Sequence, residues 1–377
     1  MMRKMFAAIA LAAVSSRAEA QGSLSIQGLG FPAGGLSARA EGTGGSLGDF
    51  DPLSLVSPAS LAGVRAAALF LQYSPEFRRV TAGSSTANTT TARFPMVSGV
   101  LPMGQEWTMG LSSSTFLDRS SETSLVRRQQ VGGLLDSVNV TERNKVLGAI
   151  NDVRLALAWA RSPGFRIGVG AHVFTGSNRI SFSEIFPDSS KYLSTARSGR
   201  ISFAGFAGSL GMEIHPSRVI GFAVSGRKGG DLRAQSGDTA IGTARLPDHY
   251  SASAVYEGIT GAAISARVAR DNWSSLAPLT SSTKAFDGWD TGVGAEVTGP
   301  RLMQRIIIVR AGARFRTLPF GFNGEKVSET SFMAGFGVPL TQDRAGFDFA
   351  LQRASRTAGG NVKERGYILS FGLRVSP

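Results

Sequence analysis

The chain has 377 residues, a formal net charge of +13 and no cysteine. The lack of cysteine excludes a disulfide framework, a thiol nucleophile and a cysteine-held metal site. Glycine accounts for 47 residues and charged residues for only 18% of the chain, whereas soluble proteins average about 7% glycine and about 25% charge.

Residues 1–20 have the pattern of a cleaved secretory signal peptide. A short positive region precedes the apolar residues 5–14, and residues 18–20 (Ala-Glu-Ala) fit the small-x-small cleavage rule. The apolar stretch is much shorter than the roughly 20 residues of a membrane-spanning helix. We therefore expect an exported chain that begins at Gln21 after cleavage.

Residues 21–65 show no regular apolar period and are rich in glycine, serine, alanine and proline. They precede the first alternating segment of the chain, so we expect no strand from them. Their place in the fold depends on the size of the sheet that follows.

From residue 66 onward, apolar residues recur at every second position in one segment after another. This period of two predicts β-strands with one apolar face. The rest of the chain has no apolar run near the length of a spanning helix. Fourteen strands are expected, at residues 66–74, 91–102, 105–117, 150–162, 164–175, 199–214, 217–228, 248–257, 260–271, 287–298, 302–316, 329–338, 344–354 and 365–376.

The second face of these strands is rich in glycine, alanine and serine, with an occasional charge. A soluble sandwich shows water a fully polar face, whereas a membrane barrel turns its apolar face to lipid and its other face to the lumen. Tight turns such as 102–104 alternate with long connections such as 118–149, as periplasmic turns and external loops do in outer-membrane barrels.

The predicted fold class is therefore all-β. We expect a transmembrane antiparallel up-and-down β-barrel of about 14 strands over residues 66–377, in the bacterial outer membrane. A barrel with this many strands has a lumen wide enough to need filling. We expect residues 21–65 to fold into it as a plug or hatch.

The segment at residues 199–214 changes phase. Ile201 and Phe203 fall on one parity, whereas Phe206 and the apolar residues after it fall on the other. Either a β-bulge at Gly205 re-aims the side chains, or the bounds of the strand are drawn wrongly. Both interpretations stay open.

Charged residues on the small-residue face are candidates for the lumen or for ligand contacts. A lumen requires such charges to be paired or wet. They form either an internal salt-bridge network or a lining that guides the anionic head of an amphiphile. The candidates are Arg154, Arg166, Arg267, Asp290, Glu296, Arg310, Arg314, Arg316 and Asp348.

Two regions resemble the outer-membrane hydrophobic-compound transport superfamily of FadL/TodX-type channels. The first comprises residues 38–45 (Ala-Arg-Ala-Glu-Gly-Thr-Gly-Gly), Asp51-Pro52 and 57–62. The resemblance implies a hatch motif at Ser57, Pro58 and Ala59, where Ser57 departs from the usual asparagine.

The second region, from Leu246-Pro247 to the C-terminus, is similar to a branch that includes the PorV-like proteins of type IX secretion. The resemblance implies a channel for hydrophobic or amphiphilic small molecules. The alternative is a PorV-like component that binds or assembles secretion-system proteins. Outer-membrane lipid and lipopolysaccharide are expected partners in either case, because arginine and lysine in the predicted external loops can pair with phosphate groups.

The sequence does not predict catalysis, a cofactor or a metal site. Only three histidines occur, far apart in the chain, and residues 207–211 (Ala-Gly-Ser-Leu-Gly) match a nucleophile elbow only faintly, since they lack its first glycine and lie inside a strand. We therefore expect no catalytic residue and no enzyme. Nucleic acid is not an expected partner, because the aromatic residues lie on apolar strand faces and not among the basic residues.

Overall fold

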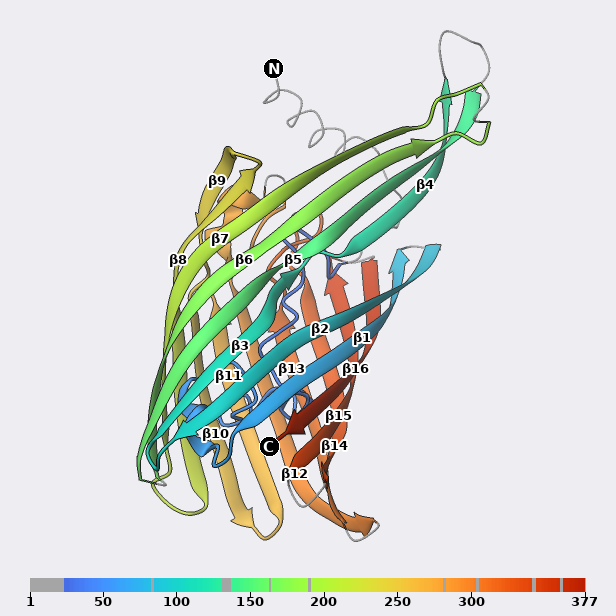
Figure 1. Cartoon of the computed structure of the whole chain (residues 1–377). Helices are drawn as coiled ribbons and strands as arrows, with labels where there is room; N and C mark the ends of the chain where they lie inside the picture. The colour runs from blue at the N-terminus through green and yellow to red at the C-terminus, as the bar shows by residue number, and fades with distance from the viewer. Residues whose placement is uncertain are drawn as a thin grey trace.

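The computed structural model describes residues 24–82, 85–130, 137–162, 164–188, 191–280, 283–302, 305–340, 344–359 and 362–376. The expected signal peptide lies outside these residues. Within them, sixteen strands form one antiparallel sheet. Fourteen of these strands close into a barrel, because β1 pairs with both β2 and β16 and because β8 pairs directly with β10 (Figure 1). The predicted all-β barrel of fourteen strands is confirmed.

The strands of the barrel wall are β1 (Ala68–Ala82), β2 (Ser85–Met103), β3 (Trp107–Asp118), β5 (Ser137–Ser162), β6 (Phe165–Ile185), β7 (Thr195–Ile214), β8 (Ile220–Ser236), β10 (His249–Ile259), β11 (Ala262–Asp271), β12 (Gly288–Leu302), β13 (Arg305–Thr317), β14 (Ser328–Leu340), β15 (Ala345–Ala358) and β16 (Val362–Val375). Each overlaps one of the fourteen predicted segments. Two further strands, β4 (Ser121–Gln130) and β9 (Thr239–Arg245), pair only with β5 and β8.

The sequence pattern missed β4, β9 and the distal parts of β5 and β6. β4 and the ends of β5, β6 and β7 project well beyond the barrel at the end where the long connections lie (Figure 1). Most positions of β4 are exposed or half-exposed. Where both faces of a strand meet water, nothing enforces an alternation of apolar and polar residues, so the signal of period two is absent.

The wall carries large apolar side chains on its outer face. Phe94, Phe206, Leu210 and Phe332 each have more than 60% of their surface exposed. A contiguous apolar belt of this kind is rare on soluble proteins and fits the lipid-facing band of a membrane barrel. Among the described helices, none is both long and apolar enough to cross a membrane.

β7 keeps one parity along its whole length, so its side chains are not re-aimed at Gly205. Ile201 and Phe203 face inward with the same parity as the rest of the inner face, and Phe203 belongs to a buried apolar cluster. The register between β7 and β8 does shift next to Gly205, but β8 supplies the extra residue, since Gly230 and Asp231 lie opposite Phe206. The inner wall is apolar at this level, so apolar residues occur on both faces of β7, and the sequence pattern resembles a change of phase.

Within the described residues, three short helices accompany the barrel. The α-helix α2 (Ala38–Gly42) contacts β13, β14, β15 and β16, and the 3₁₀-helix η1 (Ala59–Gly63) contacts β3, β5, β6 and β7. The 3₁₀-helix η2 (Trp273–Leu279) contacts β9. Because α2 and η1 touch opposite groups of strands, residues 24–65 cross the interior of the barrel (Figure 1). We call these residues the N-terminal segment.

Candidate functional site

Glycines in the wall provide the space in which the N-terminal segment lies. A Cβ atom on Gly294 or Gly312 would overlap the backbone of Thr43, and one on Gly292 would overlap the carbonyl of Gly44. The segment therefore approaches β12 and β13 more closely than any side chain there would allow. The small-residue face predicted from the sequence is therefore the surface against which the backbone of the N-terminal segment packs.

The three residues of the expected hatch motif meet the opposite wall. A Cβ on Gly168 would lie 2.5 Å from the carbonyl carbon of Pro58 and 2.6 Å from the nitrogen of Ala59. Ser57 is fully buried, and its hydroxyl has no hydrogen-bond partner among the described residues. The contact in this place is backbone against glycine, so it does not depend on an asparagine at position 57.

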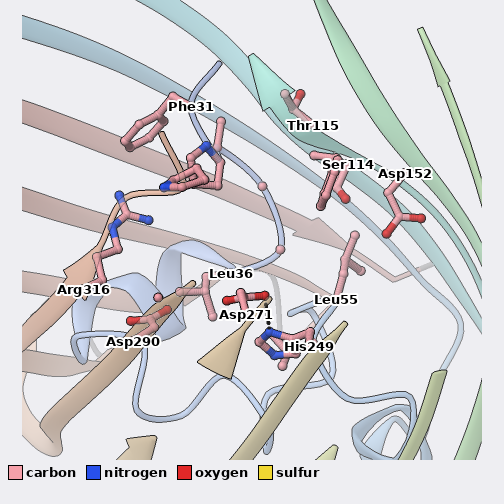
Figure 2. Close-up of a pocket in the computed structure, with 18 of the residues that line it drawn as sticks. Phe31, Leu36, Leu55, Ser114, Thr115, Asp152, His249, Asp271, Asp290 and Arg316 are labelled. Atoms are coloured by element: carbon pink, nitrogen blue, oxygen red, sulfur yellow. Dashed lines mark hydrogen bonds and ion pairs between the residues drawn. The ribbon is translucent and has the colours of Figure 1, made fainter. Parts of the chain in front are cut away.

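Two cavities lie on either side of the N-terminal segment. The first, which we call the inner chamber, has a free volume of about 170 Å³ and lies toward the long connections. The second has a free volume of about 590 Å³ and lies toward the tight turns, where Arg65 and Arg374 line it. Leu36 and Leu55 of the segment point toward the inner chamber (Figure 2).

The inner chamber has an aromatic part and a charged part. Phe116 stacks on Trp273 with ring centres 5.4 Å apart, and both residues line the chamber. Asp290 and Arg316 lie across the chamber from Asp152 (Figure 2). The chamber can thus contact an apolar group and a polar group of one small molecule at the same time.

The structure places all nine candidate lumen residues on the inside of the wall, and each has a partner. Arg166 pairs with Glu213 at the end with the tight turns, and Arg154 donates to the carbonyl of Leu55. The remaining seven belong to three clusters: Glu296, Arg310 and Asp348 with Arg39; Arg267, Asp290 and Arg314 with Asp49; and Arg316 with Glu329 and Arg356.

The first cluster joins the wall to α2. Arg39 binds Glu296 through two hydrogen bonds of 2.9 and 3.0 Å. Arg310 donates to the same carboxylate at 2.7 Å and to Asp348 at 2.5 Å. Two cations and two acids therefore alternate beneath α2, and the N-terminal segment supplies one of the cations.

Asp49 joins the N-terminal segment to the second cluster. Its carboxylate accepts hydrogen bonds from Ser225, Ser251 and Ser253 and from Arg267 at 3.0 Å. Burial alone would raise the pKa of Asp49, but Arg267 and the three hydroxyls outweigh it and hold this pKa below its usual range. Asp49 stays charged and anchors the segment to β8, β10 and β11.

The third cluster is the most deeply buried. Arg356 is fully buried and binds Glu76 at 2.7 Å, Glu329 at 2.6 Å and Glu364 at 2.5 Å. Its guanidinium also lies 4.8 Å from the ring centre of Phe31 in the N-terminal segment. One cation thus ties together β1, β14 and β16 and the first part of the segment.

The sequence pattern did not identify several of the charged residues in these three clusters. Asp49 lies in a segment without periodicity, and Glu76, Glu329, Glu364 and Arg356 lie at or beyond the ends of the predicted strands. The only available signal was parity, because extending each strand by a few residues places these charges on the inner face. Among the described residues, no group of three histidine, aspartate or glutamate side chains is placed to hold a metal ion.

We expect the substitution Arg356→Met to lower the free energy of unfolding by about 3–5 kcal/mol, because it leaves three buried carboxylates short of their shared cation. Urea unfolding of the protein in vesicles measures the change. Arg353→Met, on the exposed face of the same strand, is the matched control and should cost less than 1 kcal/mol, as surface changes do. Equal losses in the two variants would contradict a structural role for the cluster.

Glu41 predicts a pH dependence of stability. Burial raises its pKa to about 7, against the opposing effect of a hydrogen bond to Ser370 and of Arg314 and Arg316. The folded protein therefore holds a proton that the unfolded chain loses near pH 4.5, and the free energy of unfolding falls as pH rises from about 4.5 to 7. The variant Glu41→Gln stays neutral, so we expect it to be more stable than the parent by roughly 3 kcal/mol at pH 8 and equal to it at pH 4.

Unfolding midpoints across pH 4–8 for the parent protein and Glu41→Gln measure this effect. Glu325→Gln, at an exposed position, serves as the control and should leave the profile unchanged. A Glu41→Gln profile parallel to that of the parent protein would show that Glu41 does not titrate in this window.

The structure of the chain is similar to solved structures of outer-membrane channels. No protein-family model matches the chain, and no curated protein sequence matches it. A Pseudomonas aeruginosa FadL homologue superposes with a TM-score of 0.64 at 12% identity, over 93% of this chain and 99% of that one.

Two toluene transporters also superpose over nearly their whole length. Ralstonia pickettii TbuX has a TM-score of 0.57 at 14% identity, over 94% of this chain and 100% of that one. Pseudomonas putida TodX has a TM-score of 0.58 at 13% identity, over 93% and 99%. The chain therefore has the fold of the FadL/TodX-type outer-membrane channels for hydrophobic compounds.

Proposed function

We propose that the protein is an outer-membrane channel that passes small hydrophobic or amphiphilic molecules. The observation that carries this proposal is the inner chamber, which lies between the long connections and the N-terminal segment and offers both an aromatic and a charged lining. Binding sites for small molecules are typically apolar clefts with a few placed polar groups. The named substrates of the two toluene transporters support the same class of cargo.

The size of the inner chamber favours a small cargo. Its free volume is about 170 Å³, and a cavity of about 150 Å³ binds benzene in another protein. A single aromatic ring with a short substituent fits this space, whereas a long acyl chain exceeds it. We therefore infer that the substrate class is a small aromatic or short amphiphilic compound.

The N-terminal segment would act as the hatch of this channel. It separates the two cavities, and it is held by Asp49 and Arg39 on one side and by the backbone contact at Gly168 on the other. With the tight turns facing the periplasm, as in other outer-membrane barrels, cargo would enter the inner chamber from outside. Passage then requires the segment to move or a side exit to open above it.

Toluene uptake by cells that carry the channel tests the proposed cargo. Phe116→Ala removes part of the aromatic lining and should lower uptake about fivefold, since one aromatic contact is worth about 1 kcal/mol. Phe332→Ala, on the outer face, is the matched control and should leave uptake unchanged. If neither the parent protein nor Phe116→Ala raises uptake above that of cells without the channel, the proposal fails.

Removal of residues 21–62 tests the hatch. The described part of this stretch, residues 24–62, supplies no strand of the wall, so the barrel should still insert and show the usual change in gel mobility on boiling. Because the lumen would lose its filling, conductance in planar bilayers should rise above that of the parent protein. A folded, inserted barrel with unchanged conductance would show that the segment does not block the lumen.

The second candidate function is a binding component of a secretion system. The arm formed by β4 and the distal parts of β5, β6 and β7 is the feature that favours it, because it projects far beyond the barrel (Figure 1). Its surface carries exposed ion pairs of Glu122 with Arg143 and with Lys145. If toluene uptake fails, this arm becomes the first surface to test for a protein partner.

A further inference from the structure

Three neighbouring strands bring an aspartate, a histidine and a serine into contact on the wall of the inner chamber. Asp152 lies on β5, His172 on β6 and Ser209 on β7. The Nδ1 atom of His172 is 2.9 Å from each carboxylate oxygen of Asp152, and its Nε2 atom is 2.8 Å from the hydroxyl oxygen of Ser209. All three line the chamber, and Figure 2 shows Asp152 pointing into it.

The partners of the two ring nitrogens of His172 determine which atoms carry the hydrogens. Since a carboxylate only accepts hydrogen bonds, Nδ1 of His172 carries the hydrogen that Asp152 accepts. In neutral imidazole Nε2 is then an acceptor, and the hydroxyl of Ser209 donates to it. This is the arrangement in which a histidine can remove the proton of a serine nucleophile.

A glycine leaves the space for the serine. Gly170 of β6 lies opposite Ser209 of β7 in the register. A Cβ atom on Gly170 would lie 2.5 Å from the hydroxyl oxygen of Ser209. Any other residue at position 170 would therefore displace Ser209 from His172.

Two arginines supply positive charge beside the serine. Arg154 lies opposite His172 in the register, is 98% buried and has an Nε atom without a partner among the described residues. Arg227 lies opposite Ser209; a terminal nitrogen of its guanidinium is 3.8 Å from a carboxylate oxygen of Asp152, whereas its Nε atom has no partner in the described part of the chain. Its guanidinium is held 5.2 Å from the ring centre of Phe116. Unpaired N–H groups next to a nucleophile are the donors that stabilise an oxyanion.

We propose that the inner chamber also hydrolyses small carboxylic esters, with Ser209 as the nucleophile, His172 as the general base and acid, and Asp152 as the residue that positions His172. The small volume and the aromatic lining select an uncharged ester with a short or monoaromatic group. This activity goes beyond passage through the channel and would act on molecules held there.

Each step balances with water as the only co-reactant. The hydroxyl oxygen of Ser209 attacks the ester carbonyl carbon while its proton moves to Nε2 of His172. The bond to the alcohol oxygen breaks, and His172 returns the proton to the departing alcohol. Water then attacks the acyl carbon, gives a proton to His172, and the carboxylic acid leaves as Ser209 regains that proton.

The experiment uses the purified full-length protein in detergent, with a fluorophosphonate as the covalent probe and p-nitrophenyl acetate as the ester. We expect the fluorophosphonate to attach to Ser209, as located by mass spectrometry. Ser209→Ala should abolish this label and lower ester hydrolysis at least 100-fold, since general-base catalysis of this kind contributes about 10²–10⁴-fold. Ser98→Ala is the matched control, because Ser98 is an inward-facing, 95%-buried serine on β2 whose hydroxyl has no partner among the described residues.

Asp152 is tested by two variants. Asp152→Asn keeps the size of the side chain and should slow labelling of Ser209 at least 100-fold, whereas Asp152→Glu should recover part of the rate. The change in gel mobility on boiling shows that each variant is folded. If Asp152 had only a structural role, Asp152→Asn and Asp152→Glu would label Ser209 at the same rate. The proposal is overturned if folded parent protein takes up no label at Ser209, or if Ser209→Ala hydrolyses the ester as fast as Ser98→Ala. Toluene uptake is a separate measurement, so failure of the esterase proposal does not decide whether the protein is a channel.

Discussion

A closed wall of fourteen strands encloses more space than its own inward side chains can fill, and the rest of the structure follows from how that space is occupied. The N-terminal segment fills it, and its backbone lies directly on glycines such as Gly294 and Gly312. Glycine in the wall therefore has a packing role. The loss of side chains on one surface allows a second layer of chain to lie against it.

The segment is held by charge as well as by shape. Arg39 and Asp49 each enter a cluster in which wall residues of opposite sign complete the pairing. Buried charges are tolerated only when paired and hydrogen-bonded, so a displaced segment would leave Glu296 and Arg267 with fewer partners. Stability and the filling of the lumen therefore depend on the same ion pairs, and any motion of the segment must exchange them for water.

The inner chamber joins two kinds of chemistry that the fold alone does not require. Its aromatic part, with Phe116 and Trp273, fits an apolar cargo. Its polar part includes the hydrogen-bonded row of Asp152, His172 and Ser209. An apolar pocket beside an activated hydroxyl is what an ester would need, because the pocket holds the molecule while the polar row reaches its carbonyl. Channel and catalyst would share one space.

Much of the barrel was predictable from the sequence. The alternation in fourteen segments located every strand of the wall and the lipid-facing side, because a strand that crosses a membrane must present apolar residues at every second position whatever its neighbours are. The same parity placed Arg310 and the other candidate charges on the inner face. It failed for β4, which is exposed on both faces, for the short β9, and at Gly205, where the inner wall is itself apolar.

Only the tertiary structure decided which of the inward side chains meet. His172 is 20 residues from Asp152 and 37 from Ser209, and these spacings give no sign of contact, so residues 207–211 by themselves do not identify a nucleophile. The register between β5, β6 and β7 aligns the three residues across neighbouring strands. The path of the N-terminal segment through the lumen likewise determines which acids meet Arg39 and Arg267. Register and path depend on the closure of the whole barrel, whereas alternation is a local property that each strand shows by itself.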